Sequence, residues 1–277
     1  MQYVLIAALF FLMVSVGMSL RVAELFANWR RHRWGTWLCL LAATFLIPPL
    51  LALLLANLFR LTLGETAGLF LVGAAPGAPL LMRNMARRGY DLHMAASYQL
   101  WAGLLVPLAI PAVVAAGAKL YGRDVWIPPS VLFKQIAVKQ LLPLAIGMAF
   151  AWLAPKLAER LCPKLNTLGN ALLLVMIVAI LIKLGPALKQ AKPLVPVATI
   201  LLAVGSIGAV LMFRMGSPVV RQTFAICNAN RHVGLALLLT GQYVRANNAL
   251  PTVVCYALTA PLIMFAYAKL HPVQKTG

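Results

Sequence analysis

Proline and glycine interrupt an apolar segment that is otherwise long enough to cross a lipid bilayer. The interruption reads Val72-Gly73-Ala74-Ala75-Pro76-Gly77-Ala78-Pro79. Proline lacks the backbone N–H that a helix needs, and lipid offers no replacement donor for the carbonyl that loses its partner. A break at bilayer depth therefore survives only inside protein or beside a cavity. We expect a broken helix at 76–79, where secondary transporters bind their cargo; the alternative is a kinked helix satisfied by its neighbours.

A second interruption lies at a comparable place in the other half of the chain. It reads Asn228-Ala229-Asn230-Arg231-His232 and is the most polar run inside any hydrophobic segment. Two disturbed segments in corresponding positions are typical of a transport site between two repeats. We therefore place the substrate site where these two interruptions meet.

The composition predicts a polytopic membrane protein. Of the 277 residues, 62% are hydrophobic and only 10% are charged, whereas a soluble domain has about 25% charged residues. The net charge of +19 reflects the presence of only five acidic residues. Because the basic residues cluster between apolar segments, this charge indicates membrane topology and not a nucleic-acid partner. The expected partners are the lipid bilayer and a small molecule.

Apolar runs of about 20 residues predict roughly nine transmembrane helices in an all-α fold. They fall at approximately 2–20, 34–58, 64–87, 91–118, 128–154, 166–186, 193–214, 217–242 and 248–270. With the N-terminus outside, fourteen basic residues lie on the inner side and nine on the outer side. The positive-inside rule then predicts a multi-pass protein of the inner or plasma membrane, with the N-terminus outside and the C-terminus in the cytoplasm.

The two halves of this single membrane domain have the pattern of an inverted repeat. Pro76 to Pro107 spans 31 residues, and so does Asn230 to Pro261. Asn230 lies 154 residues after Pro76, and the same offset pairs the predicted segments 34–58, 64–87 and 91–118 with 193–214, 217–242 and 248–270. This gives a first repeat at about 2–118 and a second at about 128–270, with four and five helices. An odd number of helices in the full repeat makes the two halves antiparallel in the membrane.

Three stretches resemble the bile acid:sodium symporter family and its arsenite-permease relatives. They are Phe10-Phe11-Leu12-Met13-Val14-Ser15-Val16-Gly17-Met18-Ser19-Leu20, then Pro76-Gly77-Ala78-Pro79 with Ala86-Arg87-Arg88-Gly89-Tyr90-Asp91, and Asn230-Arg231-His232-Val233-Gly234-Leu235-Ala236-Leu237. The resemblance implies a ten-helix inverted-repeat fold, with a panel domain and a core domain in which two broken helices cross at the substrate site. This chain would lack the first of those helices.

The chain departs from the family pattern at the positions that the resemblance assigns to sodium. Family members carry polar ligands just after the first Pro-Gly, a glutamate in the second crossing helix and a glutamine before its asparagine. The residues present are Pro79, Leu80, Leu81, Ala225 and Ala229. Sodium requires several oxygen ligands, so we expect its usual sites to be absent, and we expect no metal or cofactor. The arsenite relatives have a cysteine where this chain has Gly77.

Arg231 is the sharpest candidate for a substrate contact. An arginine at the bilayer centre costs at least about 2.5–3.5 kcal/mol, so it is expected to face a cavity or a partner. An anionic substrate, backbone carbonyls or water could serve, and the alternative is a later helix start with Arg231 at the interface. His232 could carry a coupling proton or simply pack by a hydrogen bond.

The other substrate-binding candidates are polar residues near the two breaks. Asn228 and Asn230 offer amide donors and acceptors to the cargo, or bond to neighbouring helices instead. Ser97 and Gln99, one turn into the fourth segment, could extend the site from the other side. Together with Pro76, Gly77, Ala78, Pro79, Arg231 and His232, they form the predicted site.

These residues favour a secondary transporter of a small organic anion that works by alternating access, coupled to protons or uncoupled. A metalloid or oxyanion permease is the nearest alternative, and the missing cysteine after Pro76 weighs against it. A channel or a transport-inactive membrane protein is also compatible with the lost sodium ligands. An enzyme is not expected, because the sequence contains no paired carboxylates, HExxH motif or Ser/His/Asp set.

Overall fold

The computed structural model describes residues 2–19, 34–77, 90–121, 129–190, 192–213, 216–244 and 248–272. Every regular element in these residues is a helix, which confirms the all-α prediction for the described part of the chain. By length and composition, three helices there are apolar enough to cross a membrane: Gly35–Leu58, Pro155–Ala179 and Ala249–Leu270. Several shorter apolar helices accompany them. The count of nine spans and the inverted repeat stay predictions.

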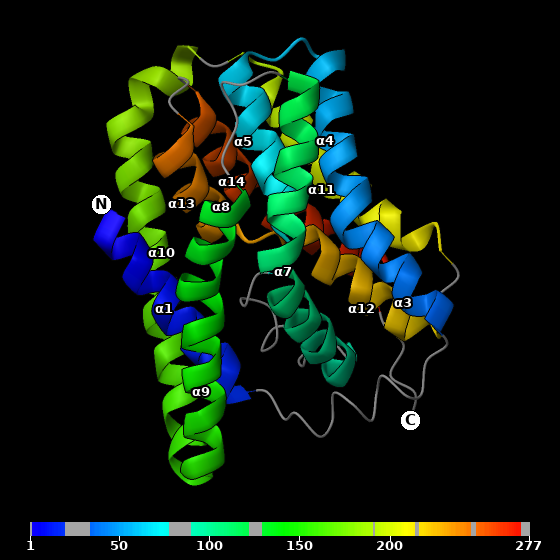
Figure 1. The fold of residues 1–277 in the computed structure, drawn as a ribbon. Coiled ribbons are helices and arrows are strands. Elements are labelled where there is room, and N and C mark those ends of the chain that lie inside the picture. Colours follow the sequence, from blue (N-terminus) through cyan, green and yellow to red (C-terminus); the bar gives the residue numbers. More distant parts are fainter. Residues whose placement is uncertain are drawn as a thin grey trace.

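One group of helices contains α1 (Gln2–Ser19), α8 (Pro129–Ile136), α9 (Leu142–Leu153) and α10 (Pro155–Gln190). The π-helical segment η4 (Ala137–Leu141) joins α8 to α9, and α1 packs against both α9 and α10 (Figure 1). Gly17 and Gly147 allow α1 and α9 to approach closely, because a Cβ at either position would collide with the backbone of the other helix. Small residues commonly mediate helix contacts in membranes.

The remaining helices form a second group that packs against the first (Figure 1). They are α3 (Trp34–Leu41), η1 (Ala42–Leu46), α4 (Ile47–Leu58), α5 (Leu63–Ala74), α7 (Leu92–Tyr121), α11 (Val195–Leu211), α12 (Pro218–Ala229), α13 (Val233–Tyr243) and α14 (Ala249–Leu270). The largest cluster of buried apolar residues draws on α5, α11, α13 and α14, and includes residues of α1 and α10. The core therefore extends across the boundary between the two groups.

Both segments predicted to be broken are interrupted in the structure. Helix α5 ends at Ala74, and the chain is non-helical from Ala75 to Gly77, where Gly77 adopts a φ of 79° that favours glycine. Helix α12 ends at Ala229, and α13 begins only at Val233. The interruptions therefore lie where the proline-glycine run and the polar run predicted them.

The sixth predicted segment, 166–186, was placed too late. Helix α10 begins at Pro155, after the single non-helical residue Ala154. Proline is well tolerated at a helix start, because the first N–H groups of a helix have no intrahelical partner. The charged side chains Lys156, Glu159 and Arg160 are exposed on this first part of the helix. Hydropathy reads such charges as the end of an apolar span, although the helix itself continues.

Candidate functional site

The two interruptions touch through their backbones. The N–H of His232 donates to the carbonyl oxygen of Ala75 at 2.8 Å. Carbonyls in the last turn of a helix have no intrahelical donor, and the first N–H groups of the next helix have no intrahelical acceptor. The contact therefore pairs the end of α5 with the start of α13. Each break partly satisfies the other at a depth where lipid cannot.

A π-helical turn in the second group supplies two further unpaired carbonyls. In η1, the N–H of Ile47 donates to Ala42, five residues back, and not to Ala43. The next two residues, Pro48 and Pro49, have no N–H at all. The carbonyls of Ala43 and Thr44 therefore have no donor within their own helix.

Asn228 and Arg231 provide the missing donors. Asn228 Nδ2 donates to Ala43 O at 2.9 Å, and Arg231 Nη1 donates to Thr44 O at 2.9 Å. The π-helical turn η1 and the prolines that follow it thus leave two free carbonyls. These carbonyls accept the hydrogen bonds that hold Asn228 and Arg231, the two side chains of the second break. π-Helical turns frequently mark functional sites for this kind of reason.

Asn228 uses both of its amide protons and both acceptor positions. Nδ2 also donates to Ser206 O at 2.7 Å, while Oδ1 accepts from Tyr98 Oη and from Arg231 Nη2, each at 3.2 Å. The residue is fully buried. A side-chain amide has two donors and one oxygen with two lone pairs, so no capacity is left for a ligand. In this structure the Asn228 amide bonds to neighbouring helices, which is the alternative to a direct contact with the cargo.

Arg231 is buried without a carboxylate partner in the described chain. Only 1% of its surface is exposed. Nη1 and Nη2 donate to Thr44 O and Asn228 Oδ1, which are uncharged oxygens, and the uncharged hydroxyl of Tyr256 also interacts with the guanidinium. Within the described residues, Nε has no hydrogen-bond partner. Buried charges are normally paired, but within the described residues the guanidinium has neither a countercharge nor an acceptor for its Nε–H.

The side chain of His232 caps the N-terminus of α13. Nδ1 accepts from the N–H of Leu235 at 3.2 Å, and the ring is 2% exposed. Because Nδ1 acts as an acceptor, the neutral ring carries its proton on Nε2. Nε2 is buried and has no partner among the described residues. The ring therefore presents a second buried donor next to Arg231.

A cavity of about 90 Å³ lies beside these residues, where the two helix groups meet. Helices α1 and α10 contribute Leu12, Leu173 and Ile177 to its wall. The second break contributes the run 230–234, and α14 contributes residues from Tyr256 to Met264. The hydroxyl of Tyr256 donates to Ala229 O at 2.7 Å, which satisfies the carbonyl at the end of α12.

The structure brings four of the ten predicted site residues together. Asn230, Arg231 and His232 line the cavity, and Asn228 Oδ1 accepts a hydrogen bond from Arg231 Nη2. Pro76 is buried next to the Ala75–His232 contact, and Ser97 is buried in α7 next to Tyr98. Ala78, Pro79 and the side chain of Gln99 lie outside the described part of the chain.

The sequence reading missed Tyr98, Tyr256 and the proline pair Pro48-Pro49. A proline pair inside an apolar run is the same signal that identified Pro76, so it could have been found. The two tyrosines carry no such signal, because a buried tyrosine in a membrane helix looks like ordinary packing until its hydroxyl partner is known.

The positions that the resemblance assigns to sodium hold apolar groups where they are described. Ala225 and Ala229 are fully buried, and both belong to an apolar cluster with Phe224. A methyl group supplies no oxygen ligand for a hard cation. Pro79, Leu80 and Leu81 lie outside the described residues.

The sequence matches the family model described as "Sodium Bile acid symporter family" over residues 6–191. This region includes η1, the break after α5 and Tyr98, and ends before the second break. None of the curated proteins compared with the chain matches it. Since the family model covers well over half of the sequence, the family resemblance carried by the motifs is confirmed, and the chain belongs to the sodium bile acid symporter family.

Proposed function

We propose that this membrane transporter carries a small organic anion, that Arg231 is the charge contact for that anion, and that transport does not use sodium. Membership of the family makes the chain a secondary transporter of a small molecule in a lipid membrane. The anionic character of the substrate, the absence of sodium coupling and the transport mechanism are the proposed parts.

The observation that carries the proposal is the unpaired charge of Arg231. The side chain is 1% exposed, and its hydrogen-bond partners among the described residues are neutral oxygens. An uncompensated charge in a low-dielectric interior is costly. A carboxylate or similar anion in the adjoining cavity would supply both the countercharge and the missing acceptor for Nε. Charge-assisted hydrogen bonds of this kind are roughly twice as strong as neutral ones.

The size of the cavity fits the charged group of such a substrate. Its volume is about 90 Å³, which corresponds to roughly three water molecules at about 30 Å³ each. His232 lines the same cavity, and its buried Nε2–H has no partner among the described residues, so a small movement of the ring would let it donate to an anion. The start of α13 adds the positive end of a helix dipole. Arg231, His232 and the start of α13 therefore all favour a negative charge in this cavity.

The position of the cavity supports alternating access. Its wall combines α1 and α10 from one helix group with the second break and α14 from the other. A relative movement of the two groups would open the cavity to one side of the membrane and then to the other, as in transporters with a binding site between repeats. In this proposal the repeats are about 2–118 and about 128–270, and the breaks at Pro76 and Asn230 are their matched parts.

The test compares Arg231→Gln and Arg231→Lys with a matched control, Arg221→Gln. Arg221 lies on α12 and is only partly buried. The purified proteins are screened against organic anions by thermal shift, since a ligand that binds the folded form raises its melting temperature. Uptake of a binding anion is then measured in proteoliposomes.

We expect Arg231→Gln to abolish the anion-dependent shift and the uptake. Arg231→Lys should retain part of both, because lysine keeps the charge but lacks the planar fork of the guanidinium. Arg221→Gln should behave as the wild type. Unchanged anion affinity per folded molecule of Arg231→Gln would remove Arg231 from the site and overturn the proposal.

A further inference from the structure

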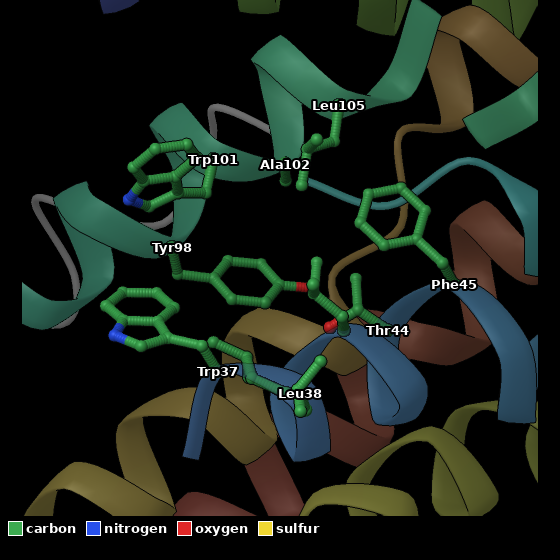
Figure 2. Close-up of a pocket in the computed structure, with 10 residues that line it drawn as sticks. Trp37, Leu38, Thr44, Phe45, Tyr98, Trp101, Ala102 and Leu105 are labelled. Carbon is green, nitrogen blue, oxygen red and sulfur yellow. The ribbon is translucent and has the colours of Figure 1, made fainter. Parts of the chain in front are cut away.

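A second and larger cavity lies between α3–η1 and α7. Its volume is about 220 Å³, and it shares no lining residue with the cavity at His232. Figure 2 shows Trp37, Tyr98 and Trp101 gathered at one end of it and Phe45 at the other. The rings of Trp37 and Trp101 meet edge to face, with centroids 6.2 Å apart. No charged side chain lines this cavity within the described chain.

The mouth of the cavity faces lipid. Leu38 and Leu41 line it and are 65% and 37% exposed. The exposed leucines continue along the same helical run at Leu46, Leu50 and Leu54. In an integral membrane protein, a row of exposed leucines along an apolar helix contacts the bilayer. The cavity is therefore continuous with the surface that lipid covers.

The depth of the cavity corresponds to lipid tails. Thr44 lines it and lies near the middle of the apolar helix Gly35–Leu58, whereas Trp37 lies near the start of that helix. At about 1.5 Å per residue, these two residues are roughly 10 Å apart along the helix axis. An apolar cavity of about 150 Å³ in another protein stays free of water and binds a hydrocarbon. This larger one suits a hydrocarbon chain in the same way.

Tyr98 connects this cavity to the substrate site. Its ring forms part of the wall, and its hydroxyl donates to Asn228 Oδ1 at 3.2 Å. The same oxygen accepts from Arg231 Nη2 at 3.2 Å. A side chain that packs in the lipid-facing cavity thus holds the group that positions Arg231.

We infer that the cavity holds one acyl chain of a bilayer phospholipid, and that this chain, by packing on Tyr98, keeps Asn228 and Arg231 in place for the anion. The lipid site stands independently of the proposed function. Only its effect on anion binding rests on that function, and the experiment separates the two.

The first measurement locates the lipid directly. The protein is placed in phosphatidylcholine vesicles that contain a small fraction of phosphatidylcholine with a diazirine in one acyl chain. After illumination, the labelled residues are mapped by mass spectrometry. We expect labelling of Tyr98 and Ala102, which are each only 3% exposed and are therefore out of reach of lipid that stays on the surface. Labelling confined to exposed residues such as Leu46, Leu50 and Leu54 would overturn the inference.

Two variants close the cavity from opposite walls, and one matched control does not. Leu38→Trp and Leu105→Trp each add volume inside it, whereas Leu50→Trp makes the same change on the lipid-facing row outside it. We expect labelling of Tyr98 and Ala102 to fall several-fold in the first two variants and to stay at the wild-type level in the third. Unchanged labelling in both cavity variants would also overturn the lipid site.

The second measurement tests the connection through Tyr98. Anion affinity is determined in detergent after phospholipid is removed, and again after phosphatidylcholine is added back. We expect phosphatidylcholine to raise the affinity of the wild type and of Leu50→Trp several-fold. It should not change that of Tyr98→Phe, which keeps the ring but cannot bond to Asn228. Equal affinity of the wild type with and without phospholipid would overturn the connection. If no anion binds under any condition while Tyr98 is labelled, the proposed function fails and the lipid site stands.

Discussion

The backbone N–H of His232 donates to the carbonyl of Ala75 at 2.8 Å, and this bond joins residues that are far apart in sequence. One belongs to the end of α5 and the other to the start of α13. Around this bond, Asn228 and Arg231 bond to the carbonyls of Ala43 and Thr44. The site is therefore held by side chains of one half that satisfy the backbone of the other.

Restoring a helical donor in α4 should weaken anion binding. In Pro48→Ala, the new N–H lies four residues after Thr44 and can bond to its carbonyl, which removes an acceptor of Arg231. Hydrogen bonds to charged groups contribute about 1.5–3 kcal/mol. Displacement of Arg231 should therefore weaken anion binding by about tenfold or more, measured by thermal shift or equilibrium binding.

A matched control is available for this substitution. Pro143 follows the other π-helical turn, η4, in the same way that Pro48 follows η1. Its helix does not contact Arg231 through any hydrogen bond recorded in the described chain. Pro143→Ala should therefore leave anion affinity unchanged. An equal loss of affinity in both variants would mean that the effect is a general one on helix geometry.

A carboxylate introduced next to Arg231 should pair with its guanidinium and so prevent the anionic substrate from binding there. In Asn228→Asp, the new charge lies at the position from which Oδ1 now accepts a bond from Arg231 Nη2. The internal ion pair should abolish the stabilisation by anions. The variant should also melt at a lower temperature, because a carboxylate cannot donate to Ala43 O and Ser206 O as the amide does. Anion binding that survives in a folded Asn228→Asp protein would contradict the assigned role of Arg231.

Sodium should have little effect on binding or uptake. The positions that the family uses for a carboxylate and an amide hold the methyl groups of Ala225 and Ala229, both fully buried. Replacing sodium by potassium or choline should leave anion uptake in proteoliposomes within about twofold, because neither position offers a side-chain oxygen as a ligand. A saturable, steep dependence on sodium would require an ion site elsewhere in the chain.

Loss of the carboxylate at Glu65 should reduce stability and leave substrate affinity alone. Glu65 is fully buried; Oε2 accepts from Thr62 N at 2.8 Å, and Oε1 accepts from Lys192 N at 2.9 Å. In Glu65→Gln, the amide nitrogen cannot accept one of these bonds, at a cost of about 1–3 kcal/mol. The melting temperature should fall, whereas the exposed Glu159→Gln should not change it. A fall in both variants would point to net charge as the cause.

The location of the breaks could be predicted from the sequence because the signals are local. Pro76 removes a donor, and an arginine in an apolar segment requires a partner, whatever the rest of the fold does. The partners of Arg231 could not be predicted, because Pro48 and Pro49 leave Thr44 O without a helical donor but only the folded structure brings that carbonyl to Arg231. The role of Tyr98 depends on which side chain of α12 lies opposite its hydroxyl. Contacts between residues so far apart in the sequence cannot be predicted from residue spacing.

The same network has a consequence for biosynthesis. The carbonyls of Ala43, Thr44 and Ala75 all belong to the part of the chain that is made first, and their donors lie within the short run 228–232. An unsatisfied carbonyl in hydrocarbon costs several kcal/mol. Until that run leaves the ribosome, the early helices therefore need water, or a protein of the insertion machinery, at these three places. The three carbonyls can therefore gain their final donors only after most of the chain has been made.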